Sequence, residues 1–157
     1  MKIKIICIGK TKRGFLAQGI DDYLPRLKHY TTLEWIEIQS CVKSKSSSYE
    51  EGVREEGKKI RTHIHASAIM VTLTEKGKEY TTKDFAGWLE SEMIKGRREI
   101  DFVIGGDQGL APSLISDAQI CLSLSRMTFT HQMARLILLE QLYRAFTIIR
   151  GEPYHHG

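Results

Sequence analysis

The carboxyl third of the chain gathers side chains that can carry a proton or a positive charge. They are His131, Arg135, Arg144, Tyr154, His155 and His156, and the same span holds only two acids, Glu140 and Glu152. Histidine and tyrosine can exchange protons with a substrate, and arginine can stabilise a developing negative charge. Each residue also has an ordinary interpretation. Arg144 can pair with Glu140 four residues earlier, His131 stands where a helix N-cap would be, and a chain end can fray. Spacing alone favours the ordinary interpretation for any one of them.

A second candidate site follows the short apolar run at residues 101–104. Gly105 and Gly106 come directly after this run, Gly109 lies three positions further on, and Pro112 stands near the first turn of a predicted helix. A strand that ends in glycines and leads into a helix leaves backbone amides free at the carboxyl edge of a sheet. Ligands bind at that edge in open α/β sheets. Glycines that only make a tight turn explain the pattern about equally well.

Several other chemistries lack their motifs. The G-G-x-x-G pattern does not match the G-x-G-x-x-G of dinucleotide-binding proteins, and neither a P-loop nor an H-E-x-x-H motif is present. The one close histidine pair, His155 and His156, is adjacent in sequence, so the two side chains point apart. No metal-ligand spacing occurs, and we expect no metal site.

Strands and helices alternate along the chain. The pattern predicts strands at residues 2–8, 33–38, 67–73, 101–104 and 118–124, because these runs are apolar or alternate with polar residues. It predicts helices at residues 15–27, 49–64 and 132–149, one capped by Thr82 and ended by Gly96, and a short one from Pro112. Residues 40–48 are predicted to form a polar, mobile loop, and residues 74–80 and 124–131 form further loops. The predicted fold is α/β, with a mostly parallel sheet and helices on both faces.

Length and composition fit one domain over residues 1–157. The apolar share is 41% and the charged share 27%, and no apolar run is long enough to cross a bilayer. Residues 1–8 are too short and too charged for a secretory signal. Three widely separated cysteines make a disulfide framework unlikely and favour the reducing cytoplasm. A formal net charge of +4 permits a nucleic-acid partner without requiring one.

The helix predicted at residues 132–149 is apolar around most of its circumference. Such a helix must be covered on more than one side. In a chain of this size, we expect the second cover to come from another subunit, so the sequence predicts a homodimer.

Four motifs in this order resemble one family. They are F-V-I-G-G-x-x-G-L from residue 102, L-S-x-S-x-M-T-F-x-H-Q-x-x-R from 122, L-x-E-Q-x-Y-R-A from 138 and G-x-P-Y-H-H from 151. They are similar to the ribosomal RNA large-subunit methyltransferase H family, a minimal branch of the SPOUT methyltransferases. The resemblance covers the whole chain, including K-I-x-I-x-x-I-G-K at its start and V-T-L-x-x-x-G-K from residue 71. The chain departs from the family at Thr130, where the family usually carries proline before the histidine, and proline would fix φ at that position.

The resemblance implies a carboxyl-terminal trefoil knot, a homodimer, and methyl transfer from S-adenosyl-L-methionine to N3 of a pseudouridine in the 23S ribosomal RNA of the ribosome. The implied cofactor-binding residues are Leu73, Gly105, Leu124, Ser125, Arg126, Met127, Thr128 and Phe129. The implied catalytic residues are His131, Arg144, Tyr154 and His155.

The chemistry of this transfer needs the acceptor nitrogen in its deprotonated form. Arg144 could stabilise that negative charge, and His131, Tyr154 and His155 are candidates to take the proton or to position the base; the sequence does not rank them. Lys10, Lys12, Arg13 and the Arg97–Arg98 pair could hold phosphates. Two alternatives stay open: a related knotted methyltransferase that acts on transfer RNA, and a non-catalytic RNA-binding module on the same scaffold.

Overall fold

A computed structural model describes residues 1–42 and 49–157, so part of the polar loop expected at residues 40–48 lies outside the described residues. Strands and helices alternate along the described chain. The first half contains β1 (Lys2–Ile8), α1 (Phe15–Lys28), β2 (Thr32–Ile38), α2 (Tyr49–His63) and β3 (Ile69–Glu79). The second half contains α3 (Thr82–Ile94), β4 (Glu99–Ile104), α4 (Pro112–Asp117), β5 (Ile120–Ser123) and α5 (His131–Ile149).

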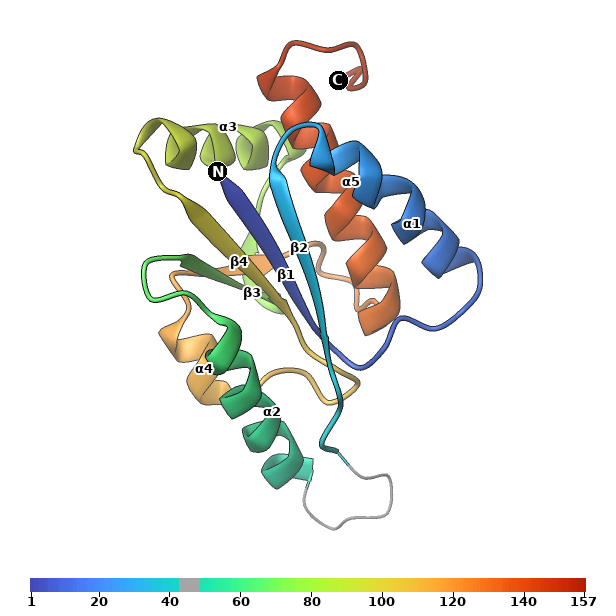
Figure 1. Cartoon of the computed structure of the whole chain (residues 1–157), viewed down its shortest axis with the longest axis vertical. Coiled ribbons are helices and arrows are strands. Elements are labelled where there is room, and N and C mark those ends of the chain that lie inside the picture. Colours follow the sequence, from blue (N-terminus) through green and yellow to red (C-terminus); the bar gives the residue numbers. More distant parts are fainter. Residues whose placement is uncertain (43–48) are drawn as a thin grey trace.

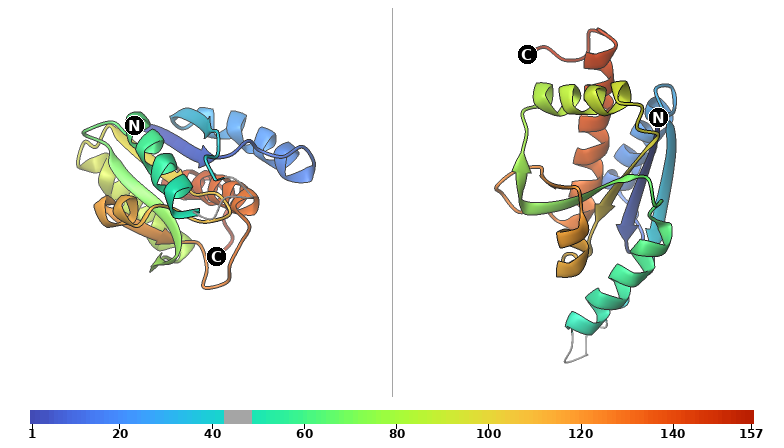
Figure 2. Two further views of the ribbon diagram at one scale, coloured as in Figure 1. Left: turned by 90° about the horizontal axis from the view of Figure 1, so that it is seen from below. Right: turned by 90° about the vertical axis from the view of Figure 1, so that its left-hand side faces the viewer.

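The five strands form one parallel sheet in the order β2-β1-β4-β3-β5. In the neighbouring inner strands β1 and β4, Ile5 lies opposite Phe102, and both side chains are completely buried. Toward their carboxyl ends, at residues 5–8 and 102–104, both strands are continuous apolar runs because helices cover both faces of the sheet. Figure 2 shows that β3 runs at a steep angle to β1 and β2, so the sheet is strongly twisted. The predicted fold class is confirmed; the trefoil knot stays a prediction.

Two layers of helices enclose this sheet (Figure 1). One core packs α1, α3 and α5 against the face that carries Ile3, Ile5 and Phe102. The other packs α2 and α4 against the face that carries Ile6 and Val103. Successive strand residues therefore supply opposite cores, as the period of two requires.

The longest helix, α5, lies against the sheet and also packs against both α1 and α3. Its apolar circumference is therefore covered on several sides within one chain, which the sequence did not indicate. Several apolar side chains on α5 are only half-buried, among them Met133, Leu136, Ile137, Ile148 and Ile149. No described helix is both long and apolar enough to cross a membrane.

Three local predictions are wrong. Residues 74–79 belong to β3 and not to a loop, because Lys78 and Glu79 pair with Leu122 and Ser123 of β5 after an irregularity that follows Leu73. The cap of α3 is Thr81, whose hydroxyl accepts from the Asp84 amide at 3.1 Å, and Thr82 is the first helical residue. His131 is likewise the first residue of α5, because Thr130 is the cap.

Candidate active site

A cleft of about 540 Å³ lies where the carboxyl ends of β3, β4 and β5 meet. Its floor is apolar, from Leu73, Ile104 and Leu122, and its walls carry the charged residues Glu75 and Asp107. The cleft is also lined by the glycine turn after β4, by the loop after β5 and by the first turn of α5. Its volume is in the range of small-molecule sites, and its position is the usual one for ligands of α/β sheets.

The glycine turn after β4 closes on itself. The Gly109 amide donates to the Gly106 carbonyl at 3.0 Å, and Gly109 adopts φ of 75°, a conformation that favours glycine. A Cβ atom on Gly105 would lie 2.6 Å from the carbonyl carbon of Gly109. The tight turn therefore requires Gly105 by itself, whether or not a ligand also approaches the backbone there.

The loop at residues 124–129 forms the opposite wall of the cleft. Leu124, Ser125, Met127, Thr128 and Phe129 all line the cleft. The Thr128 hydroxyl donates to Glu75 Oε2 at 2.7 Å, which ties the loop to β3. Arg126 differs, because its side chain is 90% exposed and its Nε donates to Glu79 Oε2 at 3.1 Å, outside the cleft. Seven of the eight predicted cofactor residues thus meet at one cleft, and Arg126 does not line it.

Thr130 links this loop to α5. Its φ of −61° is close to the value that a proline ring imposes, so threonine keeps the backbone shape that the family's usual proline would give. Its hydroxyl also accepts from the Met133 amide at 3.2 Å, a capping bond that proline cannot form. The departure from the family therefore leaves the entry into α5 intact.

His131 lines the cleft at the first position of α5. Its Nδ1 lies 2.8 Å from Asp107 Oδ1, but this buried nitrogen has no hydrogen-bonding partner of suitable geometry among the described residues. Burial of the ring is the largest influence and lowers the pKa of His131 below its ordinary value of 6.5, while the charge of Asp107 acts in the opposite direction. The partial positive charge at a helix start also disfavours imidazolium. The ring is therefore neutral at pH 7 and able to accept a proton.

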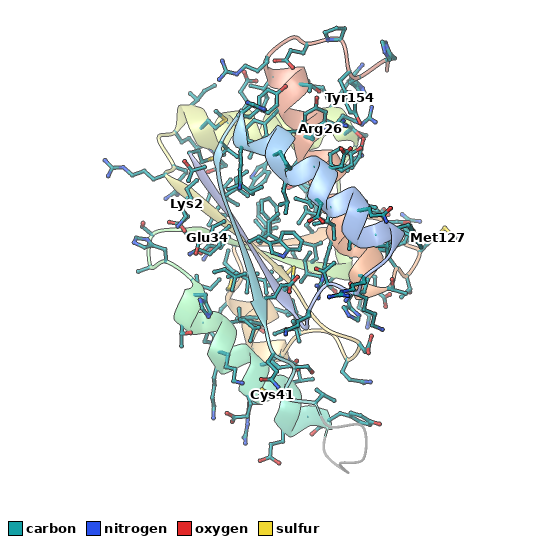
Figure 3. All side chains as sticks on the ribbon, turned by 45° about the vertical axis from the view of Figure 1, so that its right-hand side comes forward. Lys2, Arg26, Glu34, Cys41, Met127 and Tyr154 are labelled. Atoms are coloured by element: carbon teal, nitrogen blue, oxygen red, sulfur yellow. The ribbon has the colours of Figure 1, made fainter. Side chains whose placement is uncertain are left out.

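The other three predicted catalytic residues lie near or beyond the carboxyl end of α5. Figure 3 shows Tyr154 far from Met127 of the loop that lines the cleft. Arg144 follows His131 by 13 residues, which places it about 20 Å further along the helix axis. Its Nε donates to Glu140 Oε1 at 3.0 Å, so the ion pair expected from the sequence forms. Within one chain, the structure does not bring Arg144, Tyr154 or His155 to the cleft.

The chain end packs onto this far end of α5 and is not frayed. The Tyr154 ring meets Tyr143 edge-on at 4.8 Å between centroids, and the Arg144 guanidinium lies 4.7 Å from the centre of the Tyr154 ring. The Tyr154 hydroxyl is 3.2 Å from that of Tyr23 on α1. Burial and this contact raise the pKa of Tyr23. His155 is half-buried, and its Nδ1 has no hydrogen-bonding partner among the described residues.

Sequence reasoning missed several polar residues at the cleft. Glu75 and Lys76 line it because β3 continues past Leu73, and Asp107 lines it from the glycine turn. It also assigned no role to Gln132 and Arg135, which are buried beside His131. A signal for Arg135 exists: it lies three, four and seven residues before Leu138, Leu139 and Leu142, in phase with the buried stripe of α5.

Fold and cleft together define an α/β protein that binds a small ligand at the carboxyl edge of a parallel sheet. Residues 1–155 match the family described as "Predicted SPOUT methyltransferase". The chain belongs to this family. Among the described residues, no cluster of three or more histidine, cysteine or acidic side chains is arranged to hold a metal ion.

Curated relatives match over nearly their full length. A protein of Desulforamulus reducens named "Ribosomal RNA large subunit methyltransferase H" is 41% identical over 99% of both chains. Its namesake from Porphyromonas gingivalis is 40% identical, again over 99% of both chains. Among solved structures, a probable methyltransferase from Bordetella pertussis aligns with a TM-score of 0.57 at 10% identity, covering 92% of this chain and 93% of that one. At that identity the structural likeness concerns the fold alone.

Proposed function

We propose that residues 1–157 act as a single domain that transfers a methyl group from S-adenosylmethionine to N3 of a pseudouridine in 23S ribosomal RNA, on ribosomes in the cytoplasm. The observation that carries this proposal is the full-length identity of about 40% to proteins named for methylation of large-subunit ribosomal RNA. The names of these relatives refer to ribosomal RNA, which does not favour the alternative of transfer RNA as substrate. The non-catalytic alternative is disfavoured because the cleft, its loop and His131 are all in place.

The residues of the cleft fit S-adenosylmethionine. The apolar floor of Leu73, Ile104 and Leu122 suits an adenine ring, and the carboxylates of Glu75 and Asp107 suit the positive charges of the sulfonium and ammonium groups. When bound, the cofactor supplies an activated methyl group, so the chain's own residues need only bind, orient and deprotonate the acceptor. We assign binding to Leu73, Gly105 and five residues of the 124–129 loop, and propose that Arg126 acts only by bracing that loop.

His131 is the predicted catalytic residue that lines this cleft. It lines the cleft, it is neutral at pH 7 because burial lowers its pKa, and Asp107 lies beside Nδ1 to stabilise the imidazolium once a proton arrives. A neutral imidazole at this position can remove the proton from the acceptor nitrogen directly or through water. We propose His131 as the base, and Arg144 as the cation that stabilises the deprotonated ring.

Arg144, Tyr154 and His155 reach a cleft only if a second copy of the chain supplies them. In a two-fold dimer whose α5 helices run antiparallel, the carboxyl end of one α5 lies beside the amino end of the other. Since α5 has 19 residues, this pairing moves Arg144 and Tyr154 across roughly the 20 Å that separates them from His131 in one chain. We therefore propose a homodimer in which each active site combines residues of both subunits.

The surface for such a dimer is apolar. Phe15 at the start of α1 is 73% exposed and Met127 in the cofactor loop is 74% exposed, and both are large apolar side chains. The half-buried apolar side chains on α5 add further apolar area. Large exposed apolar side chains are common at protein interfaces. Light scattering that finds only a 17.9 kDa species at micromolar concentration would contradict the dimer.

The decisive experiment for the reaction compares substrates. Purified protein with S-adenosylmethionine should methylate ribosomes that lack the modification, and mass mapping should locate the methyl group on one pseudouridine of 23S RNA. Transfer RNA from the same cells serves as the rival substrate. Methylation of transfer RNA but not of ribosomes would overturn the proposed substrate and leave the assignment of the reaction intact.

Calorimetry tests the cofactor. S-adenosylmethionine should bind and NAD should not. Leu73→Trp should abolish binding by filling the cleft, while Arg126→Ala, which removes a side chain that points away from the cleft, should leave the affinity within about twofold because only a surface ion pair is lost. Unchanged binding in Leu73→Trp would show that the cofactor lies elsewhere.

A further inference from the structure

The loop between β1 and α1 at residues 9–14 carries three cations that face solvent. Lys10, Lys12 and Arg13 are all exposed, and none forms an ion pair with a described residue. Unpaired surface cations are common, so their presence alone identifies no site. What distinguishes this loop is the way its backbone is held.

Two buried side chains of α5 bind the backbone of this loop. Gln132 Oε1 accepts a hydrogen bond from the Lys12 amide at 3.0 Å, and Gln132 Nε2 donates to the Lys10 carbonyl, also at 3.0 Å. Arg135 donates from Nη2 to the carbonyls of Ile8 at 2.6 Å and Gly9 at 2.9 Å. Three backbone groups of the loop and the last carbonyl of β1 are thus attached to the first turns of α5.

A third attachment comes from β2. Arg135 Nη1 donates to the Thr11 hydroxyl at 3.0 Å, and the Thr11 amide donates to Glu37 Oε1 at 3.0 Å. Burial tends to raise the pKa of Glu37, but the bonds from Thr11 and Trp35 and the charge of Arg135 outweigh it and lower that pKa. Glu37 therefore stays ionised at neutral pH and lies 3.7 Å from the buried guanidinium.

Arg135 is completely buried, which is unfavourable for a charged group. An apolar residue would fill this position in the core more simply, and the bonds that Arg135 makes all serve the loop and its partner Glu37. The backbone of the loop forms its hydrogen bonds toward the interior, while Lys10, Lys12 and Arg13 are exposed to solvent. Because the loop is already fixed, less conformational entropy is lost when these cations bind a ligand.

The loop also has a fixed relation to the cleft. Gln132 Nε2, which holds Lys10, lies 3.1 Å from Nε2 of His131, the proposed base. A polyanion that contacts the loop is therefore held in a defined position relative to the group that acts on the acceptor.

We propose that residues 9–14 form a preorganised phosphate-binding loop for the RNA backbone, and that Gln132 and Arg135 are positioning residues that keep it in register with His131. The proposal rests on the proposed function in that the polyanion is the RNA substrate. It predicts that this loop, rather than the Arg97–Arg98 pair, holds the phosphates next to the target base. That pair precedes β4 at the opposite, amino edge of the sheet.

Binding of 23S RNA at a series of salt concentrations tests the loop independently of methyl transfer. The double variant Lys10→Gln/Lys12→Gln should bind more weakly, and the slope of log affinity against log salt should fall by about 1.5, since each lost phosphate contact removes roughly 0.7 to 0.9. Arg54→Gln/Lys59→Gln on α2 removes the same charge from the other side of the sheet and should change the slope by much less. Equal slopes for the two double variants would overturn the proposal.

Kinetics test the positioning residues. Gln132→Met keeps the length of the side chain but loses both backbone bonds, so KM for ribosomes should rise about tenfold. Because the variant also loses the contact with His131 Nε2, kcat can change too, but by less than KM. Cofactor affinity should not change. Arg135→Lys keeps the charge, and its KM for ribosomes should lie between the values of the wild type and Gln132→Met. An equal loss of kcat and kcat/KM in Gln132→Met would instead assign that residue to the reaction and refute a positioning role.

The outcomes separate the two proposals. Salt-dependent RNA binding through the loop without methyl transfer to ribosomes would refute the proposed function and keep the loop. If ribosomes are methylated but the loop variants change neither the salt slope of RNA binding nor KM, the proposed function stands and the phosphate-binding role of the loop is refuted.

Discussion

The two ends of α5 hold polar groups in opposite ways. At the amino end, Gln132 and Arg135 are buried and bind backbone atoms of another element. At the carboxyl end, Arg144 and Tyr154 are half-buried and contact mainly other side chains, Glu140, Tyr143 and Tyr23. Backbone targets fix a position in space, whereas side-chain contacts can be exchanged for others at small cost. The amino end is thus built to hold a geometry, and the carboxyl end can release its groups to a partner.

The largest expected effect comes from removing the chain end. Deleting residues 153–157 should lower methyl transfer at least ~100-fold, typical for loss of an acid–base or positioning group, with cofactor affinity unchanged. If the site combines two subunits, mixing this variant with His131→Ala should restore activity through heterodimers that carry one intact site. Neither variant alone should be active. If the mixture stays inactive, the proposal that each active site combines residues of both subunits is wrong.

The pH dependence of methyl transfer examines the amino end. Because burial lowers the pKa of His131 below 6.5, the ring is neutral at pH 7, and kcat should fall only as the pH drops below 6.5 toward that lowered pKa. Well below the pKa, kcat should fall tenfold per pH unit, since only the neutral ring accepts a proton. The same shift makes the folded state less stable as the pH falls through this window, because the unfolded chain binds the proton more readily. Asp107→Asn should lower the pKa further; an unchanged profile would argue against His131 as the base.

Stability should respond to the packing of Tyr154. Tyr154→Leu removes the edge-on contact with Tyr143 and the hydroxyl contact with Tyr23, and should lower the free energy of unfolding by about 1 to 2 kcal/mol. The chain end therefore contributes to packing, which the sequence did not indicate. Chemical denaturation measures the loss, and His156→Ala, in an exposed residue of the same segment, should have little effect.

The smallest effect concerns the entry into α5. Thr130→Ala should cost about 1 kcal/mol of stability because the cap on the Met133 amide is lost. Thr130→Pro should give up the same cap but recover part of the cost by restricting the unfolded chain, since the native φ of −61° already suits proline. Thermal unfolding ranks the three proteins. A proline variant less stable than the alanine variant would show that the loop before His131 does not tolerate the family's usual residue.

Much of this architecture could be read from the sequence because alternation and turn residues are local signals. The strand at residues 2–8 and the helix from Pro112 could be predicted from residues that are neighbours along the chain. The continuation of β3 to Glu79 could not be predicted, because its polar residues extend only through pairing with β5, some 40 residues later. The predicted helix caps, Thr82 and His131, each lie one residue after the true caps, Thr81 and Thr130, because two adjacent polar residues at each helix start could act as the cap.

The candidate site divides in the same way. The cleft residues were implied by the resemblance to the family, and the sheet gathers those that stand at strand ends at one edge. The separation of His131 and Arg144 could also have been inferred from the chain, since His131 was expected at the cap of the predicted helix at residues 132–149, which carries Arg144. The folding back of Tyr154 onto Tyr143 could not, because it depends on an aromatic cluster assembled from α1, α5 and the chain end.

The buried guanidinium of Arg135 has a consequence for how the chain acquires its fold. It bonds to the Ile8 carbonyl, 127 residues earlier, and α5 fills the space between α1 and α3. β1 therefore leaves the ribosome well before α5 during synthesis, yet the loop after β1 finds these partners only when α5 emerges. Contacts so distant in sequence slow folding, and the part of the sheet face that α5 covers stays exposed until then.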